Sequence, residues 1–148
     1  MEFQKNRAKE YIVEAELTLE SAKAIFKKSS NELPLWALVV KNSYDAMEQA
    51  ISSLIVLEDQ IVPKEHPAKI LKFVEIYGRE DSLVKKLLSW LSKRARAQYV
   101  DITKNNEISV PHKIFNKENA EQALGDAEEI IKTLKNKIFF GPENAQNS

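Results

Sequence analysis

The sequence contains no cysteine and has little glycine or proline. In 148 residues there are three Gly and five Pro. The lack of thiols excludes disulfide scaffolds, thiolate zinc sites and cysteine nucleophiles, and it suits a reducing cytoplasm, where we expect the protein to reside. The few Pro and Gly residues divide the chain into segments, because Pro fits the first turn of a helix and Gly favours the position just past its end.

Long apolar runs and an excess of either charge are also missing. The longest apolar stretch, residues 33–40, includes Pro34 and is far shorter than the ~20 residues of a membrane span. The N-terminal residues are charged and lack the apolar core of a secretory signal. The 22 basic side chains balance 22 acidic ones, which argues against a histone-like basic protein or an acidic tail. We therefore expect a soluble protein with no membrane partner.

Apolar residues recur with a helical period in five segments. The segment that follows Pro34 is apolar on two sides, which predicts a central helix with neighbours on both. The last segment has the most regular apolar stripe, from Ala120 to Ile138, and Asn116 stands where its N-cap is expected. The pattern predicts an all-α fold, a five-helix up-and-down bundle with a four-helix core and one short helix. Its core is expected to include Leu54, Leu87, Leu91, Leu124 and Ile131.

The helical pattern predicts a single domain over residues 1–142, followed by a flexible tail over residues 143–148. Between about residues 100 and 117 neither helical nor strand periodicity is evident, so we expect a long irregular loop and no sheet. Gly125 alone falls inside a helical pattern. For it we expect close contact with a neighbouring helix rather than a hinge.

The sequence offers few candidates for a metal or cofactor site. A di-iron bundle requires Glu-x-x-His pairs, and neither His66 nor His112 has Glu three residues before it. Asp45 and Glu48 share a face of the central helix and have the chemistry for acid–base work or for Mg²⁺. The favoured interpretation is a polar stripe that faces solvent or crosses a dimer contact. We expect no bound metal and no cofactor.

Positive charge is concentrated in residues 79–117. This segment has nine Lys or Arg residues and four acidic ones, an excess of +5, so the rest of the chain carries −5. Such a surface is suited to phosphates, or equally to an acidic face on another copy. Within it, Arg94 lies beside the apolar seam and needs an acceptor, either a neighbouring carboxylate, which we favour, or a ligand phosphate. Arg96 and Tyr99 are three residues apart and share a helix face.

Three strings in the sequence resemble the HEPN-domain family, in particular its small stand-alone prokaryotic members. Asn-Ser-Tyr-Asp-Ala-Met-Glu-Gln-Ala (42–50) resembles the second helix of the family, and His-Pro-Ala-Lys-Ile-Leu (66–71) resembles the entry to its third. Arg-Ala-Arg-Ala-Gln-Tyr-Val-Asp (94–101) resembles the end of the fourth helix. The resemblance extends over roughly residues 5–140. It implies a helical bundle, commonly dimeric, with a cleft where fourth helices meet.

The resemblance also implies a nucleic-acid function. Many members are ribonucleases, toxins of toxin–antitoxin pairs or partners of minimal nucleotidyltransferases, and their catalytic signature is Arg, four to six residues, then His. Arg94 matches the arginine, but Tyr99 stands in the histidine place. An unperturbed tyrosine remains a neutral donor, whereas histidine exchanges protons near neutral pH. The departure therefore predicts binding, with weak or absent cleavage.

From these observations we expect a dimeric HEPN-like protein that binds a nucleotide, an RNA or a nucleotidyltransferase partner. The ligand is expected at the basic end of the fourth helix. The expected phosphate-binding residues are Lys93, Arg94, Arg96, Tyr99 and Asp101.

Two alternatives stay open. The first is a metal-independent endoribonuclease in which Arg94 stabilises phosphate charge and Tyr99 or His112 assists. The second is a purely structural module whose basic side binds an acidic protein. Self-association is expected because the second and fourth helices carry surplus apolar surface, including Trp36 and Trp90.

Overall fold

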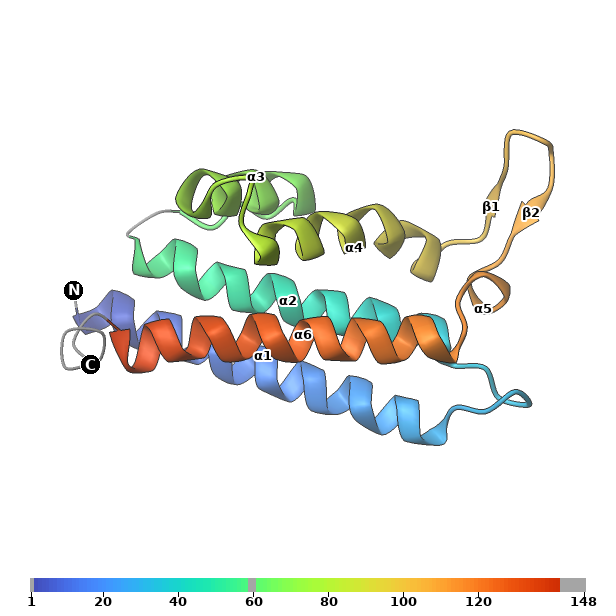
Figure 1. Ribbon diagram of the computed structural model, residues 1–148, viewed down its shortest axis with the longest axis horizontal. Coiled ribbons are helices and arrows are strands. Elements are labelled where there is room, and N and C mark those ends of the chain that lie inside the picture. Colours follow the sequence, from blue (N-terminus) through green and yellow to red (C-terminus); the bar gives the residue numbers. More distant parts are fainter. Residues whose placement is uncertain (1, 59–60, 142–148) are drawn as a thin grey trace.

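The chain folds into a bundle of α-helices from which one short β-hairpin projects (Figure 1). The computed structural model describes residues 2–58 and 61–141, and within these ranges there are six helices and two strands. The elements are α1 (Glu2–Lys28), α2 (Trp36–Leu57), α3 (His66–Tyr77), α4 (Ser82–Gln98), β1 (Asp101–Ile102), β2 (Ile108–Ser109), α5 (Pro111–Ile114) and α6 (Lys117–Phe139). The predicted all-α bundle is confirmed.

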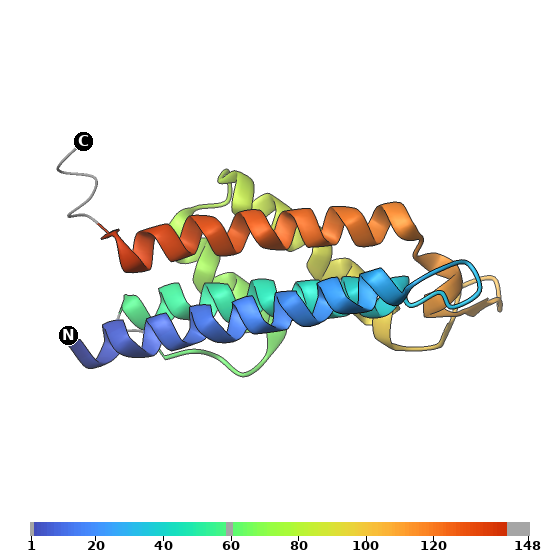
Figure 2. The ribbon, with the colours of Figure 1, turned by 90° about the horizontal axis from the view of Figure 1, so that it is seen from below.

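α2 is the central helix, as the two apolar sides of its sequence predicted. It packs against α1 and α6 on one side and against α3 and α4 on the other, and Figures 1 and 2 show these groups on either side of it. α1, α2, α4 and α6 alternate in direction (Figure 1), which is the expected up-and-down order. Sixteen of the 22 residues of α2 are buried, so its position is determined by contacts on nearly every side.

Local sequence signals determine where two helices begin. At the start of α4, the Asp81 carboxylate accepts a hydrogen bond from the backbone N–H of Leu83 at 2.8 Å. At the start of α6, Asn116 and Asn119 form reciprocal side-chain-to-backbone hydrogen bonds, both of 2.9 Å. Such caps satisfy N–H groups that have no partner within the helix. The predicted N-cap at Asn116 is thereby confirmed.

The predicted core residues belong to one hydrophobic cluster. Leu54, Leu87 and Ile131 are buried in it, and Leu91 and Leu124 are partly buried against it.

The two tryptophans fill this same core. Trp36 is 7% exposed, and Trp90 is 1% exposed and donates its indole N–H to Asp126 at 2.8 Å. The expectation that they contribute apolar surface for self-association is therefore wrong, because the fold of a single chain already covers them.

The segment after α4 is more ordered than expected. β1 and β2 pair antiparallel, with Asp101 opposite Ser109 and Ile102 opposite Ile108. The turn that joins them places Asn106 at a φ of 62°, a left-handed conformation that Asn tolerates better than most residues. The expectation of no sheet is wrong here, because two-residue strands are too short to produce a recognisable alternation. α5 then leads through the buried Phe115 into α6.

Two further expectations concern the C-terminal tail and membrane-spanning helices. The predicted tail, residues 143–148, lies outside the described residues. Among the helices that the structure describes, none combines the length and the apolar character needed to cross a membrane.

Gly125 does not make the close helix contact that we expected. It lies exposed on α6, and apart from its chain neighbours and the adjacent backbone of α6 no atom lies within 4 Å of the position that a Cβ would occupy. α6 runs without interruption through it. The expectation of a packing role is therefore wrong.

A methyl group at this position should stabilise the protein. We expect Gly125→Ala to raise the free energy of unfolding by ~0.5–1 kcal/mol, because alanine loses less backbone entropy in a helix. Urea denaturation monitored by circular dichroism measures the change. Gly78→Ala is the matched control and should destabilise, because Gly78 has a φ of 90° that an L-residue adopts only with strain. A loss of stability in Gly125→Ala would contradict the open surroundings of this residue.

Candidate functional site

The basic side chains near the end of α4 point in two directions. Arg96 and Tyr99 are exposed, and Arg96 has neither an ion pair nor a side-chain hydrogen bond within the described residues. Arg94, two positions earlier, is rotated by about 200° around the helix axis. Its side chain is 17% exposed and faces α2. Lys93 lies with its Nζ 4.5 Å from the centre of the Trp90 ring.

Arg94 finds its acceptor on the central helix. Its Nε donates to Oδ1 of Asp45 at 3.3 Å, and Oδ2 of Asp45 accepts from Nζ of Lys41 at 3.2 Å. The guanidinium carbon lies 5.9 Å from the centre of the Tyr44 ring, a cation–π contact. The favoured prediction, a neighbouring carboxylate, is confirmed. Because the pair is partly exposed, its net contribution to stability is small.

Glu48, one helical turn further along α2, is a buried carboxylate with two partners from α3. It is 3% exposed; Oε2 lies 2.5 Å from Nδ1 of His66, and Oε1 accepts from Nζ of Lys69 at 3.3 Å. A buried charge is costly without such partners. The interpretation of Glu48 as part of a solvent-facing stripe is therefore wrong. The signal that we missed was His66 and Lys69, whose i, i+3 spacing at the start of α3 places both on one face.

Tyr44 lies between these two groups of charges. Its ring is buried and lies 6.2 Å from the His66 ring, centre to centre. Burial raises the pKa of the Tyr44 hydroxyl well above its ordinary value, and the negative charge of Glu48 raises this pKa further. The hydroxyl therefore stays neutral at physiological pH. We refer to seven residues together as the polar cluster: Lys41, Tyr44, Asp45, Glu48, His66, Lys69 and Arg94.

The remaining predicted site residues do not join the polar cluster. Asp101 is exposed and its Oδ1 accepts from the backbone N–H of Ile102 at 2.8 Å, so it stabilises the base of the hairpin. His112 is exposed on α5. The structure thus brings Arg96, Tyr99 and Asp101 to one exposed end of the bundle and directs Arg94 to its interior.

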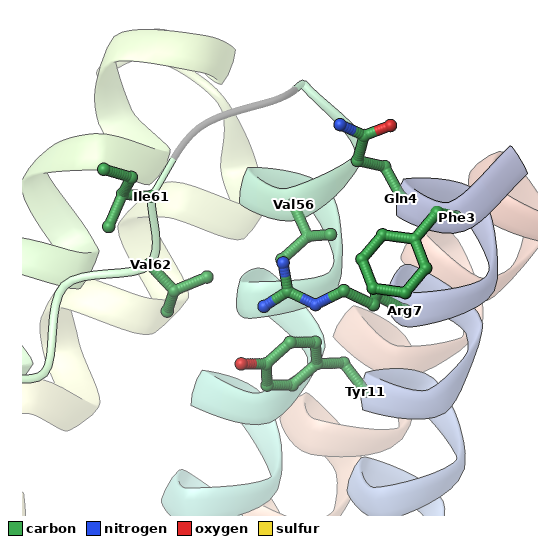
Figure 3. Close-up of a pocket in the computed structure, with 7 residues that line it drawn as sticks. All are labelled: Phe3, Gln4, Arg7, Tyr11, Val56, Ile61 and Val62. Carbon is green, nitrogen blue, oxygen red and sulfur yellow. The ribbon is translucent and has the colours of Figure 1, made fainter. Parts of the chain in front are cut away.

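A pocket of about 320 Å³ opens at the other end of the bundle (Figure 3). Its walls include Phe3, Arg7 and Tyr11, which share one face of α1, and in Figure 3 the Arg7 side chain extends toward Val56 of α2. We did not predict this face from the sequence, although the i, i+4, i+8 spacing of the three residues places them together. As for metals, the described residues contain no group of three or more His, Asp or Glu placed to hold an ion.

Comparison with known proteins identifies one family. The family model of the HEPN domain matches residues 8–137, which is most of the chain. No curated protein and no solved structure gave a match.

The raised pKa of Tyr44 predicts a loss of stability at high pH. Below pH ~10 the hydroxyl is neutral in both the folded and the unfolded chain; above this pH only the unfolded chain ionises it. The free energy of unfolding therefore falls as the pH rises above this value, by at most about 1.4 kcal/mol per pH unit. Between pH 9 and 11 we expect the free energy of unfolding to fall by roughly 1 kcal/mol more in the wild type than in Tyr44→Phe.

Urea denaturation at a series of pH values measures this difference. Tyr99→Phe is the matched control, because its ring is already 57% exposed and its hydroxyl meets water in both states. Parallel pH profiles for the wild type and Tyr44→Phe would refute a buried, neutral hydroxyl.

Proposed function

The chain belongs to the HEPN-domain family, and on this premise we propose that it binds RNA through the exposed end of α4. The family suggests a function related to nucleotides or RNA. The observation that carries the proposal is that Arg96 and Tyr99, three residues apart in the sequence, are both exposed, with no acid bonded to Arg96 within the described residues. A guanidinium in this state is free to form two parallel hydrogen bonds with a phosphate.

The charge around Arg96 supports this assignment. Asp45 already neutralises Arg94, so Arg94 adds little to the field outside the bundle. Along residues 93–117 five other cations remain, against two acidic residues in the same range. These cations are Lys93, Arg96, Lys104, Lys113 and Lys117. An excess of this kind attracts a polyanion and releases its counterions on binding.

Tyr99 supplies the second element of single-strand recognition. An exposed aromatic ring beside a basic groove or strip is a platform on which a base stacks, at ~1–3 kcal/mol per base. Tyr99 directly follows α4, and its backbone N–H still bonds to the carbonyl of Ala95 at 3.0 Å. This bond holds the backbone of Tyr99 at the end of the helix, three residues after Arg96. A free nucleotide offers the same phosphate and base, but it makes fewer contacts than a strand.

RNA binding should depend on Arg96 and on salt. We expect Arg96→Ala to weaken binding of a fluorescein-labelled single-stranded RNA roughly 10- to 100-fold, since a charge-assisted hydrogen bond is worth ~1.5–3 kcal/mol. Tyr99→Ala should weaken binding more than Tyr99→Phe, because only the first removes the ring. The affinity should fall as salt rises. Fluorescence anisotropy measures all of these changes.

The control for this experiment removes the same charge elsewhere. Lys132 is exposed on α6, and Lys132→Ala should leave the affinity nearly unchanged. If Lys132→Ala weakens binding as much as Arg96→Ala does, the interaction is not localised at the end of α4. If only mononucleotides bind, the ligand is a nucleotide. If neither RNA nor a mononucleotide binds, binding to a protein partner such as a minimal nucleotidyltransferase becomes the leading hypothesis.

We also propose that the protein forms a homodimer in the cytoplasm. HEPN domains commonly dimerise, and the exposed apolar side chains support an interface near the hairpin. Four large apolar side chains between residues 100 and 114 are more than a third exposed: Val100, Ile102, Ile108 and Ile114. Exposed apolar residues that gather in one segment are typical of an interface.

A charge on the hairpin should disrupt the dimer. We expect light scattering after size-exclusion chromatography to report a dimer for the wild type at tens of micromolar. Ile108→Asp should shift it to a monomer, because the aspartate would lose its hydration at the interface. Leu71→Asp is the matched control: Leu71 is 57% exposed on α3, away from the hairpin. A wild-type monomer, or a dimer in both variants, would contradict this interface.

A further inference from the structure

The pocket beside Arg7 is formed by three parts of the chain (Figure 3). Its lining residues come from α1, from the last turn of α2 and from the segment that leads into α3. Val56 of α2 is 1% exposed and belongs to the core, so the pocket reaches down to the core at this point. Tyr11 and Val62 are partly buried against the same core. The packing of the bundle therefore holds these walls in place.

Arg7 is the cation of this pocket, and it has no anion of its own within residues 2–58 and 61–141. In these ranges no carboxylate forms an ion pair or a hydrogen bond with it. None of the seven lining residues is acidic. In the view of Figure 3 the guanidinium lies between the side chains of Val56 and Tyr11. Apolar neighbours lower the local dielectric constant, which strengthens the attraction between a guanidinium and an anion that approaches it.

Large apolar side chains at the same pocket are left in water. Phe3 is 72% exposed and Ile61 is 87% exposed, although both belong to the lining. Figure 3 shows the ring of Phe3 beside the side chain of Arg7. A ligand that covers such surface removes it from water, which is favourable. An unpaired cation and uncovered apolar side chains at one pocket indicate a ligand that has an anionic end and an apolar body.

We propose that this pocket binds a small carboxylic acid with an apolar or aromatic body. The carboxylate accepts two parallel hydrogen bonds from the guanidinium of Arg7. The body lies against Phe3, Tyr11 and Val62. Mainly apolar walls with a few polar groups that fix the orientation are typical of small-molecule sites. The pocket is at the end of the bundle opposite to Arg96, so this site does not depend on the RNA binding proposed above.

Charge and volume narrow the choice of ligand. A carboxylate carries one negative charge, which Arg7 alone neutralises. A phosphate monoester carries about −1.5 to −2 charges near neutral pH. It would keep part of this charge unpaired, because no second cation is among the seven described residues that line the pocket. The volume of about 320 Å³ is near the lower limit of small-molecule sites, which span ~300–1,000 Å³. One aromatic ring with a short acidic side chain suits this volume.

Phenylacetate is a probe with both features, and NMR spectra of the backbone amides of the full chain measure its binding. We expect the largest changes in chemical shift at Arg7, Tyr11 and Val56. The changes should saturate with a Kd on the order of 0.1–1 mM, a usual affinity for so small a ligand. Phenylacetamide lacks the charge and acetate lacks the ring, so each should bind roughly 10-fold more weakly or less. Phenyl phosphate should also bind more weakly than phenylacetate.

Variants of α1 locate the binding site. Arg7→Ala should weaken phenylacetate binding roughly 10-fold or more, because the charge-assisted hydrogen bonds are lost. Arg7→Lys should keep only part of the affinity, since an ammonium does not form two parallel bonds with a carboxylate. Phe3→Ala should weaken binding less than Arg7→Ala does, and the exposure of Phe3 allows this change without a cavity in the core. Lys27→Ala is the matched control. It removes an exposed cation from the last turn of α1 and should bind as the wild type does.

The same spectra show whether each variant is folded, and no RNA is present, so this proposal and the RNA proposal fail separately. A wild type that shows no shift changes at the pocket with phenylacetate overturns the inference. Equal affinity for phenylacetamide overturns it as well, because the site would then recognise only the ring. Wild-type affinity in Arg7→Ala would mean that this side chain merely covers apolar surface. Tighter binding of phenyl phosphate would overturn the choice of a carboxylate.

Discussion

The burial of α2 is the constraint on which the rest of the structure depends. This helix is enclosed by α1 and α6 on one side and by α3 and α4 on the other, yet it carries Asp45 and Glu48 one turn apart. A carboxylate removed from water requires partners that replace its hydration. Glu48 obtains them from His66 and Lys69 at the start of α3, and Asp45 obtains one from Arg94 near the end of α4. The same interactions that satisfy α2 thus bring together side chains from three helices.

This requirement also divides the basic residues of α4 between two roles. The helix turns by about 200° over two residues, so Arg94 and Arg96 cannot face the same way. Arg94 belongs to the polar cluster, whereas Arg96 is exposed, as is Tyr99 three residues later. The proposed RNA surface and the polar cluster are therefore neighbours along one helix, although they face different surroundings.

The hairpin extends the functional end of the molecule. It follows α4 directly and projects beyond the bundle (Figure 1), with apolar side chains of both strands exposed. Its turn depends on Asn106 in a left-handed conformation, and Phe115, buried where α5 leads into α6, anchors the returning chain. Basic residues, an aromatic ring and apolar residues are consequently presented together at one end. The pocket beside Arg7 and Tyr11 is at the other end and is separate from this surface.

The sequence by itself determined the helical class, the central position of α2, the N-cap at Asn116 and the core around Leu87, because apolar periodicity and capping are local signals. It also predicted that Arg94 needs an acceptor, with a neighbouring carboxylate favoured, since a guanidinium beside an apolar seam must be paired. Only the tertiary structure decided which carboxylate it is and which residues surround it. The contact between Glu48 and His66 joins positions 18 residues apart, and that between Asp45 and Arg94 joins positions 49 apart. No periodicity along the chain encodes such pairs, because they depend on how three helices pack around α2.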